Sequence, residues 1–102
     1  MDRKQQKINS FVHDLNSVIA SLKLIDSLII NSNNEVAVKL IQEQLSNKIS
    51  FLEKVFFDSF QIKIKFIRDP NQSLNSNKIN FWEEFISNNS NSSKNTIFNI
   101  LL

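Results

Sequence analysis

The single histidine, His13, is the side chain best suited to chemistry in this 102-residue sequence. Asp14 follows it directly, and Leu15 and Asn16 come next. A carboxylate beside an exposed imidazole can hold one ring nitrogen as N–H and leave the other free to attack phosphorus. The sequence therefore offers His13 as a candidate nucleophile with Asp14 as its partner. An ordinary surface histidine without a chemical role remains the alternative.

The composition excludes several other kinds of site, because the chain contains neither glycine nor cysteine. Phosphate-binding P-loops, the dinucleotide motif G-x-G-x-x-G and Gly-flanked nucleophile elbows all need residues that lack a Cβ. Zinc and iron–sulfur centres built on Cys/His clusters cannot form with one histidine and no cysteine. We therefore expect this chain to bind neither ATP nor a cofactor of its own.

Charge and hydropathy argue against nucleic-acid and membrane partners. The formal net charge is only +2, and the lysines are interleaved with acidic residues rather than gathered on one face. The most apolar stretch, Val18–Ile30, contains Lys23 and Asp26 and is too polar to span a bilayer. No continuous apolar segment follows the charged N-terminus, so a signal peptide is not expected and the predicted location is the cytoplasm.

His13 must be positioned by the first helix. Apolar residues recur there every three or four positions, which predicts an amphipathic helix. They are Ile8, Phe11, Val12, Leu15, Val18, Ile19, Leu22, Ile25, Leu28 and Ile29. With Ile8 at heptad position a, His13 falls at position f, opposite the apolar seam. Asp2 and Gln5 resemble a capping box at the start of this helix.

A second amphipathic helix follows a short polar turn at residues 31–34, which reads Asn-Ser-Asn-Asn. This helix is predicted to run from Glu35 to about Ser59, with Lys48 intruding on its apolar side. Its apolar residues are Val38, Ile41, Leu45, Ile49, Leu52, Val55 and Phe56. A short link between two long helices predicts an antiparallel hairpin. Phe51, Phe56, Phe57 and Phe60 are expected in the core near the end of this hairpin.

Two helices alone cannot cover both apolar stripes. The apolar side chains of the first helix, at about 1.5–3 kcal/mol each when fully buried, are too many to leave in water. Pairing two hairpins about a two-fold axis would hide both stripes in a four-helix bundle. The sequence therefore predicts a homodimer.

The hydrophobic period changes after Phe60. Apolar residues then alternate with polar ones as far as Phe66, which predicts a half-buried strand. Lys63, Lys65 and Arg68 could meet an acidic partner, although a solvated strand face is the simpler interpretation. Residues 68–71, Arg-Asp-Pro-Asn, are predicted to form a turn.

The remaining residues predict one short helix and a loop. Asn80 and Glu83 form a plausible capping box for a helix that continues through Ile86. Residues 87–95 are predicted to be a polar loop or a disordered insert, since they contain only Ser, Asn and Lys. Residues 96–102 are apolar again and stop abruptly with nothing evident to pack against. This ending suggests that the rest of a domain is missing or reduced.

Residues 11–19, Phe-Val-His-Asp-Leu-Asn-Ser-Val-Ile, resemble an H-box. This is the phosphoacceptor motif in the dimerising domain of bacterial histidine kinases and related histidine phosphotransferases. The resemblance implies that His13 is phosphorylated and that Asp14 is its acid/base partner. It also places Asn16 and Ser17 where a partner docks, with Ser17 at the position that often carries Thr or Asn in kinases with phosphatase activity. Val18 stands where the family commonly has Pro.

The resemblance extends to the second helix. Residues 37–41 and 51–57 are similar to that helix in dimeric phosphotransferases of alphaproteobacterial cell-cycle relays. Those proteins continue into a degenerate ATPase-like α/β domain that no longer binds ATP. The resemblance implies that this domain would begin near Phe60. Residues 96–102 loosely resemble the helix that carries the asparagine box in true kinases.

These observations predict a mainly α protein. Residues 1–60 would form a hairpin for dimerisation and phosphotransfer, and residues 61–102 a truncated or degenerate ATPase-like α/β segment. The predicted function is a phosphorelay histidine phosphotransferase that relays a phosphoryl group between receiver-domain aspartates through His13, with Mg²⁺ supplied by the receiver. The alternative is a non-catalytic dimeric helical adaptor, or the decayed remnant of such a phosphotransferase.

Overall fold

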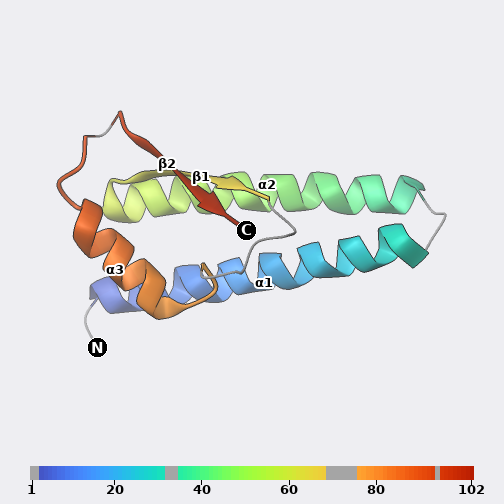
Figure 1. The fold of residues 1–102 in the computed structure, drawn as a ribbon, viewed down its shortest axis with the longest axis horizontal. Coiled ribbons are helices and arrows are strands. Elements are labelled where there is room, and N and C mark those ends of the chain that lie inside the picture. The colour runs from blue at the N-terminus through green and yellow to red at the C-terminus, as the bar shows by residue number, and fades with distance from the viewer. Residues whose placement is uncertain (1–2, 32–34, 69–75, 94) are drawn as a thin grey trace.

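A computed structural model describes residues 3–31, 35–68, 76–93 and 95–102, without the side chains of 26–31 and 37. The elements are α1 (Arg3–Asn31), α2 (Glu35–Phe60), β1 (Lys63–Ile67), α3 (Ile79–Asn89) and β2 (Ile97–Leu101). The mainly helical fold with an antiparallel hairpin is thus confirmed (Figure 1). The proposed cap by Asp2, the turns at 32–34 and 69–71, and the side chains of Leu28 and Ile29 lie outside the described residues.

The apolar stripes of α1 and α2 form the centre of the core, as their spacing predicts. Leu15 and Phe56 are fully buried, and Ile25 is 1% exposed. Side chains three and four residues apart share one face of a helix, so each stripe packs against the facing helix. The hairpin is therefore the scaffold on which every other element lies.

α2 ends at Phe60 because Gln61 adopts a left-handed backbone conformation, with φ of 60°. Its N–H donates to the carbonyl of Phe57 at 2.8 Å, which closes the last turn as a C-terminal cap does. The prediction that the strand begins at Phe60 is therefore wrong, because this residue still belongs to α2. Phe60 also continues the helical spacing of Leu52 and Phe56, and this packing extends the helix before the two-residue period takes over.

β1 and β2 form a parallel two-stranded sheet in which Lys63 pairs with Ile97 and Ile67 with Leu101. The predicted alternation of β1 is confirmed, since Ile64 and Phe66 are buried whereas Lys63 and Lys65 are exposed. Parallel strands need a long crossover connection, and α3 lies within that connection here.

The C-terminal residues differ from their prediction. Residues 97–101 form a strand rather than a helix like the one that carries an asparagine box. Ile100 and Leu102 are 5% and 6% exposed, so the apolar ending does pack against the rest of the chain. The physical reason is the parallel pairing with β1, which turns alternate apolar side chains of this segment toward the core.

α3 also departs from its predicted bounds. Its N-cap is Lys78, which makes no side-chain capping hydrogen bond, so the capping box at Asn80 is wrong. The helix continues to Asn89, into the segment expected to be a loop. The amide of Asn89 donates to the carbonyl of Phe85 at 2.8 Å. Trp82 and Ile86, four residues apart, are the buried side chains that fix this helix on the core.

Trp82 joins α3 to the hairpin. It is fully buried, and its ring centroid lies 4.9 Å from that of Phe11 and 5.1 Å from that of Phe56. Its indole N–H donates to the carbonyl of Ser76 at 2.6 Å. These contacts give Trp82 both the apolar surroundings and the hydrogen-bond partner that a buried indole needs.

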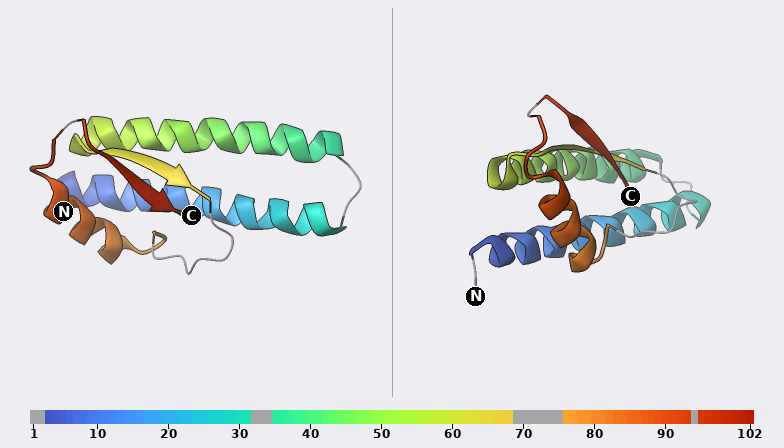
Figure 2. Two further views of the ribbon diagram at one scale, coloured as in Figure 1. Left: turned by 45° about the horizontal axis from the view of Figure 1, so that its top comes forward. Right: turned by 60° about the vertical axis from the view of Figure 1, so that its left-hand side comes forward.

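The hairpin has two unlike ends. α3 and both strands gather over the end that contains residues 3–18 and 46–60, which we name the covered end (Figures 1 and 2). The other end, residues 23–31 and 35–42, is named the open end. Here Leu24, Val36 and Leu40 are 61%, 79% and 57% exposed. The burial that the sequence assigns to a second copy is thus supplied at the covered end by the same chain.

Candidate functional site

His13 lies on the outer face of α1, where the heptad spacing places it. Its side chain is 85% exposed. The helical period accounts for this exposure, because Phe11, Val12 and Leu15 turn the opposite side of the same two turns into the core. The imidazole is therefore held on a helix whose opposite face is packed in the core, while its own ring is exposed.

Asp14 is the polar neighbour of His13. Its carboxylate Oδ1 lies 3.4 Å from Nδ1 of the imidazole, and its side chain is 60% exposed. The distance is at the long end of the hydrogen-bond range. Because an ionised carboxylate only accepts, this contact favours the tautomer with the proton on Nδ1. Nε2 then carries the lone pair and is the nitrogen available for attack on an electrophile.

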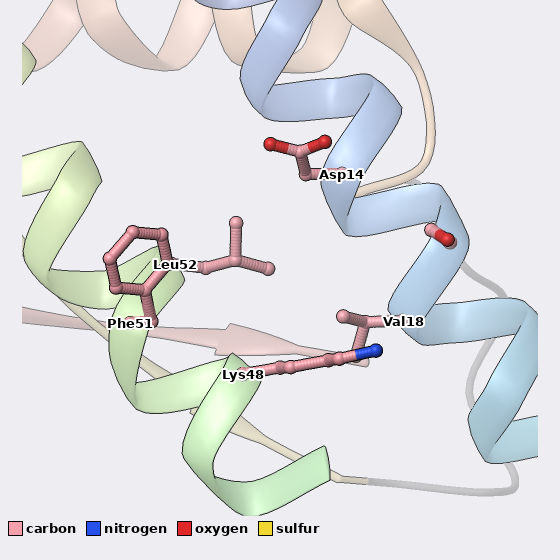
Figure 3. Close-up of a pocket in the computed structure, with 6 residues that line it drawn as sticks. Asp14, Val18, Lys48, Phe51 and Leu52 are labelled. Atoms are coloured by element: carbon pink, nitrogen blue, oxygen red, sulfur yellow. The ribbon is translucent and has the colours of Figure 1, made fainter. Parts of the chain in front are cut away.

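A shallow groove of about 250 Å³ runs between α1 and α2 next to Asp14 (Figure 3). It is lined by Asp14, Ser17, Val18, Lys48, Phe51 and Leu52. Val18 and Leu52 are buried side chains that form its apolar floor. Figure 3 shows Asp14 toward one end and the ammonium of Lys48 beside Val18, so the groove carries opposite charges along its length.

Phe51 was expected in the core, but it is 63% exposed at this groove. The prediction fails because Phe51 lies outside the i, i+3, i+4 spacing of Leu45, Leu52 and Phe56 on α2. Phe56 is buried as expected, and Phe57 and Phe60 are half-buried. Sequence reasoning missed the groove itself, for which the charged Lys48 within an apolar stripe was the available signal.

The structure places Asn16 and Ser17 on different sides of α1. Ser17 lines the groove together with Asp14. The amide of Asn16 instead donates to the backbone carbonyl of Asn77 at 3.3 Å, just ahead of α3. Asn16 therefore links α1 to the C-terminal part of the chain, while Asp14 and Ser17 are brought together beside His13.

None of the helices, as far as the chain is described, combines the length and apolar character needed to cross a membrane. Within the same described ranges, His, Cys, Asp and Glu side chains form no cluster that could hold a metal ion.

Comparison with known proteins yields no relative. No protein-family model matches the sequence, and neither the curated proteins nor the solved structures contain a significant match.

Proposed function

We propose that the chain is a phosphorelay histidine phosphotransferase with His13 as its phosphoacceptor. The observation that carries this proposal is an imidazole that is 85% exposed on a long helix, with a carboxylate at 3.4 Å from Nδ1. The H-box resemblance of residues 11–19 points to the same side chain. Phosphotransfer between proteins suits this geometry, because the partner brings the electrophile and the chain needs only a positioned nucleophile.

The proposed step is an in-line displacement at phosphorus. Nε2 of His13 attacks the aspartyl phosphate of a receiver domain, an N–P bond forms, and the P–O bond to the aspartate breaks. The aspartate leaves as a carboxylate, and Asp14 holds the Nδ1 proton as positive charge develops on the ring. The receiver would hold Mg²⁺, which would supply neutralisation of the charge on the transferring oxygens. The reverse sequence delivers the group to a second receiver.

The groove beside Asp14 supports docking of such a partner. Phe51 offers exposed aromatic surface, and the apolar floor is flanked by the charges of Asp14 and Lys48. Aromatic anchors surrounded by charged residues are typical of protein interfaces. We propose that the receiver contacts the outer face of α1 and this groove together, which would place its aspartate against His13.

We also propose that the chain forms a homodimer through its open end. Val38 and Ile41 are only partly buried there, and Leu24, Val36 and Leu40 are exposed. The hairpin leaves Leu24, Val36 and Leu40 in water, and a second hairpin packed against them would complete a four-helix bundle. Contact at this end would leave His13 at the opposite end accessible in both copies.

The direct test is phosphoryl transfer from receiver domains. Purified receivers of the source organism, labelled on aspartate with ³²P, would be mixed with the chain. We expect label that is stable to base and labile to acid on the wild type and none on His13→Ala. His13→Gln preserves a polar side chain and serves as a second check. Ser10→Ala, an exposed change on the same helix, is the matched control and should label like the wild type.

A second candidate function is a non-catalytic helical adaptor, which the exposed apolar residues of the open end favour. This alternative needs the dimer but not the histidine. It predicts that His13→Gln leaves every cellular role intact, whereas substitution of Leu40 abolishes the adaptor function. Equal labelling of wild type and His13→Ala, or no labelling by any receiver, would decide for the adaptor.

A further inference from the structure

The outer edge of β2 carries backbone groups without a hydrogen-bond partner in the described parts of the chain. In a parallel pair, the N–H and C=O of alternate residues point to the same edge. The N–H of Leu102 donates to the carbonyl of Ile67 at 2.8 Å. The backbone groups of Leu102, and of every second residue before it, therefore point toward β1. Ile97, Asn99 and Leu101 must therefore direct their backbone groups away from β1, toward the outer edge.

Two side chains close other parts of this small sheet. Glu53 of α2 accepts the N–H of Phe66 at 2.7 Å, on the edge of β1 that faces away from β2. The hydroxyl of Ser76 donates to the carbonyl of Leu101 at 3.2 Å, at the C-terminal end of the β2 edge. Both contacts agree with the edge assignment above. Among the residues that the structure describes, they leave Ile97 and Asn99 as the positions where another strand could pair.

The backbone groups of Ile97 and Asn99 at this edge have no partner among the residues that the structure describes. Ile97 is 58% exposed, and Asn99 is exposed as well. Figure 2 shows β1 between α2 and β2, so β2 is the strand farther from α2. An exposed edge of this kind is a template for pairing with another extended chain.

The outward face of the sheet next to this edge is basic. Lys63 pairs with Ile97 and Lys65 with Asn99 across the two strands. Both lysines, together with Lys54 and Phe57, line a hollow of about 360 Å³. The ammonium of Lys63 lies 5.7 Å from the ring centre of Phe57. Glu53 also lines the hollow, but its carboxylate is bonded to the backbone of β1.

We propose that β2 accepts an extended, acidic segment of a protein partner as a third strand. The segment would pair with the backbone of Ile97 and Asn99, and its outward acidic side chains would meet Lys63 and Lys65. Strands lie about 4.8 Å apart, so a third strand stands about 10 Å from β1. Lysine and glutamate side chains can span this distance together when the ammonium of Lys63 turns from the ring of Phe57 toward β2.

Charge decides between an acidic segment and a second copy of this chain. Residues 97–101, Ile-Phe-Asn-Ile-Leu, contain no charged side chain. A second β2 paired at this edge would therefore leave both lysines without a counter-charge. An acidic strand would pair with the backbone groups and also place carboxylates near the lysines. In strand addition the backbone hydrogen bonds supply affinity and the side-chain contacts supply specificity.

The test uses the full chain, labelled with ¹⁵N, and a synthetic peptide that alternates Val with Glu. The readout is the hydrogen-exchange rate of the Ile97 and Asn99 amides. We expect the acidic peptide to slow exchange at both amides by about tenfold or more at saturation. A matched peptide with Lys in place of Glu should leave both rates unchanged.

Two variants separate charge from backbone pairing. The double change Lys63→Glu and Lys65→Glu should weaken binding of the acidic peptide by about tenfold or more, whereas Lys39→Glu on α2 should not alter it. Asn99→Pro removes an outward N–H without removing a bond to β1 and should abolish protection of Ile97.

Three outcomes would overturn the proposal. They are no slowing by either peptide, equal slowing by the acidic and basic peptides, and protection that rises with protein concentration when no peptide is present. The last result would identify a second copy as the occupant of the edge.

Discussion

The covered and open ends of the hairpin are built from the same two helices but are completed differently. At the covered end, α3 and the strands contribute Trp82, Phe66 and Ile100 to a core shared with α1 and α2. At the open end, Leu24, Val36 and Leu40 remain exposed. His13 lies within the covered end. The candidate nucleophile therefore lies on the more completely packed end, whereas the dimer contact that we propose lies on the end that keeps apolar side chains exposed.

The largest effect should come from removing Trp82. Trp82→Ala deletes a fully buried side chain that contacts both helices of the hairpin, and we expect a loss of about 3–5 kcal/mol in the free energy of unfolding. Urea denaturation followed by circular dichroism measures it. Phe51→Ala, which truncates an exposed aromatic ring on the same end, is the control and should cost less than about 1 kcal/mol. Similar losses of unfolding free energy in both variants would contradict the conclusion that Trp82 stabilises the covered end.

A smaller loss is expected at the joint between α2 and β1. Glu53→Ala leaves the N–H of Phe66 without its carboxylate partner, which should cost about 1.5–3 kcal/mol in unfolding free energy. Glu53→Gln keeps an acceptor oxygen and should recover part of that loss. If Glu53→Ala unfolds at the same urea concentration as the wild type, the carboxylate does not hold β1 on the hairpin.

The open end is tested by association rather than by unfolding. Sedimentation at micromolar concentration should show a dimer. Leu40→Glu should raise the dissociation constant of the dimer about tenfold, which corresponds to about 1.4 kcal/mol. Ser46→Glu adds the same charge at an exposed polar position of the same helix outside the open end and should leave the dimer intact. A monomeric wild-type chain would contradict the proposed dimer.

The smallest effect is expected at Asn16. The hydrogen bond from its side-chain amide to the carbonyl of Asn77 is 3.3 Å long and exposed. Asn16→Ala should therefore cost about 0.5 kcal/mol or less in unfolding free energy. If Asn16 links α1 to α3 without a chemical role, phosphorylation of His13 should proceed as in the wild type. A marked loss of His13 labelling with unchanged stability would instead indicate that Asn16 contacts the receiver.

Local patterns were sufficient for the hairpin and for the direction of His13. The helical spacing of Ile8, Leu15 and Leu22 fixes which face of α1 is buried, and His13 then has to point outward. The alternation of Ile62, Ile64 and Phe66 likewise identifies β1. These features follow from side-chain periods of 3.6 and 2 residues, which need no knowledge of distant parts of the chain.

Other features were decided by contacts between residues far apart in the sequence. Residues 97–101 become a strand through pairing with β1, and α3 is placed by Trp82 and Ile86 rather than by a capping box. Phe51 becomes part of a groove because α1 and α2 pack through other faces. The amide of Asn16 reaches Asn77, which is remote in sequence.

The sequence by itself therefore determined the amphipathic hairpin, the exposed His13–Asp14 pair and the absence of glycine-dependent nucleotide motifs. The tertiary structure decided how the covered end is completed, where the groove lies and which strand edge has no pairing partner among the described residues. The physical reason is that periodicity records which face of an element avoids water, whereas only the folded chain specifies what that face meets.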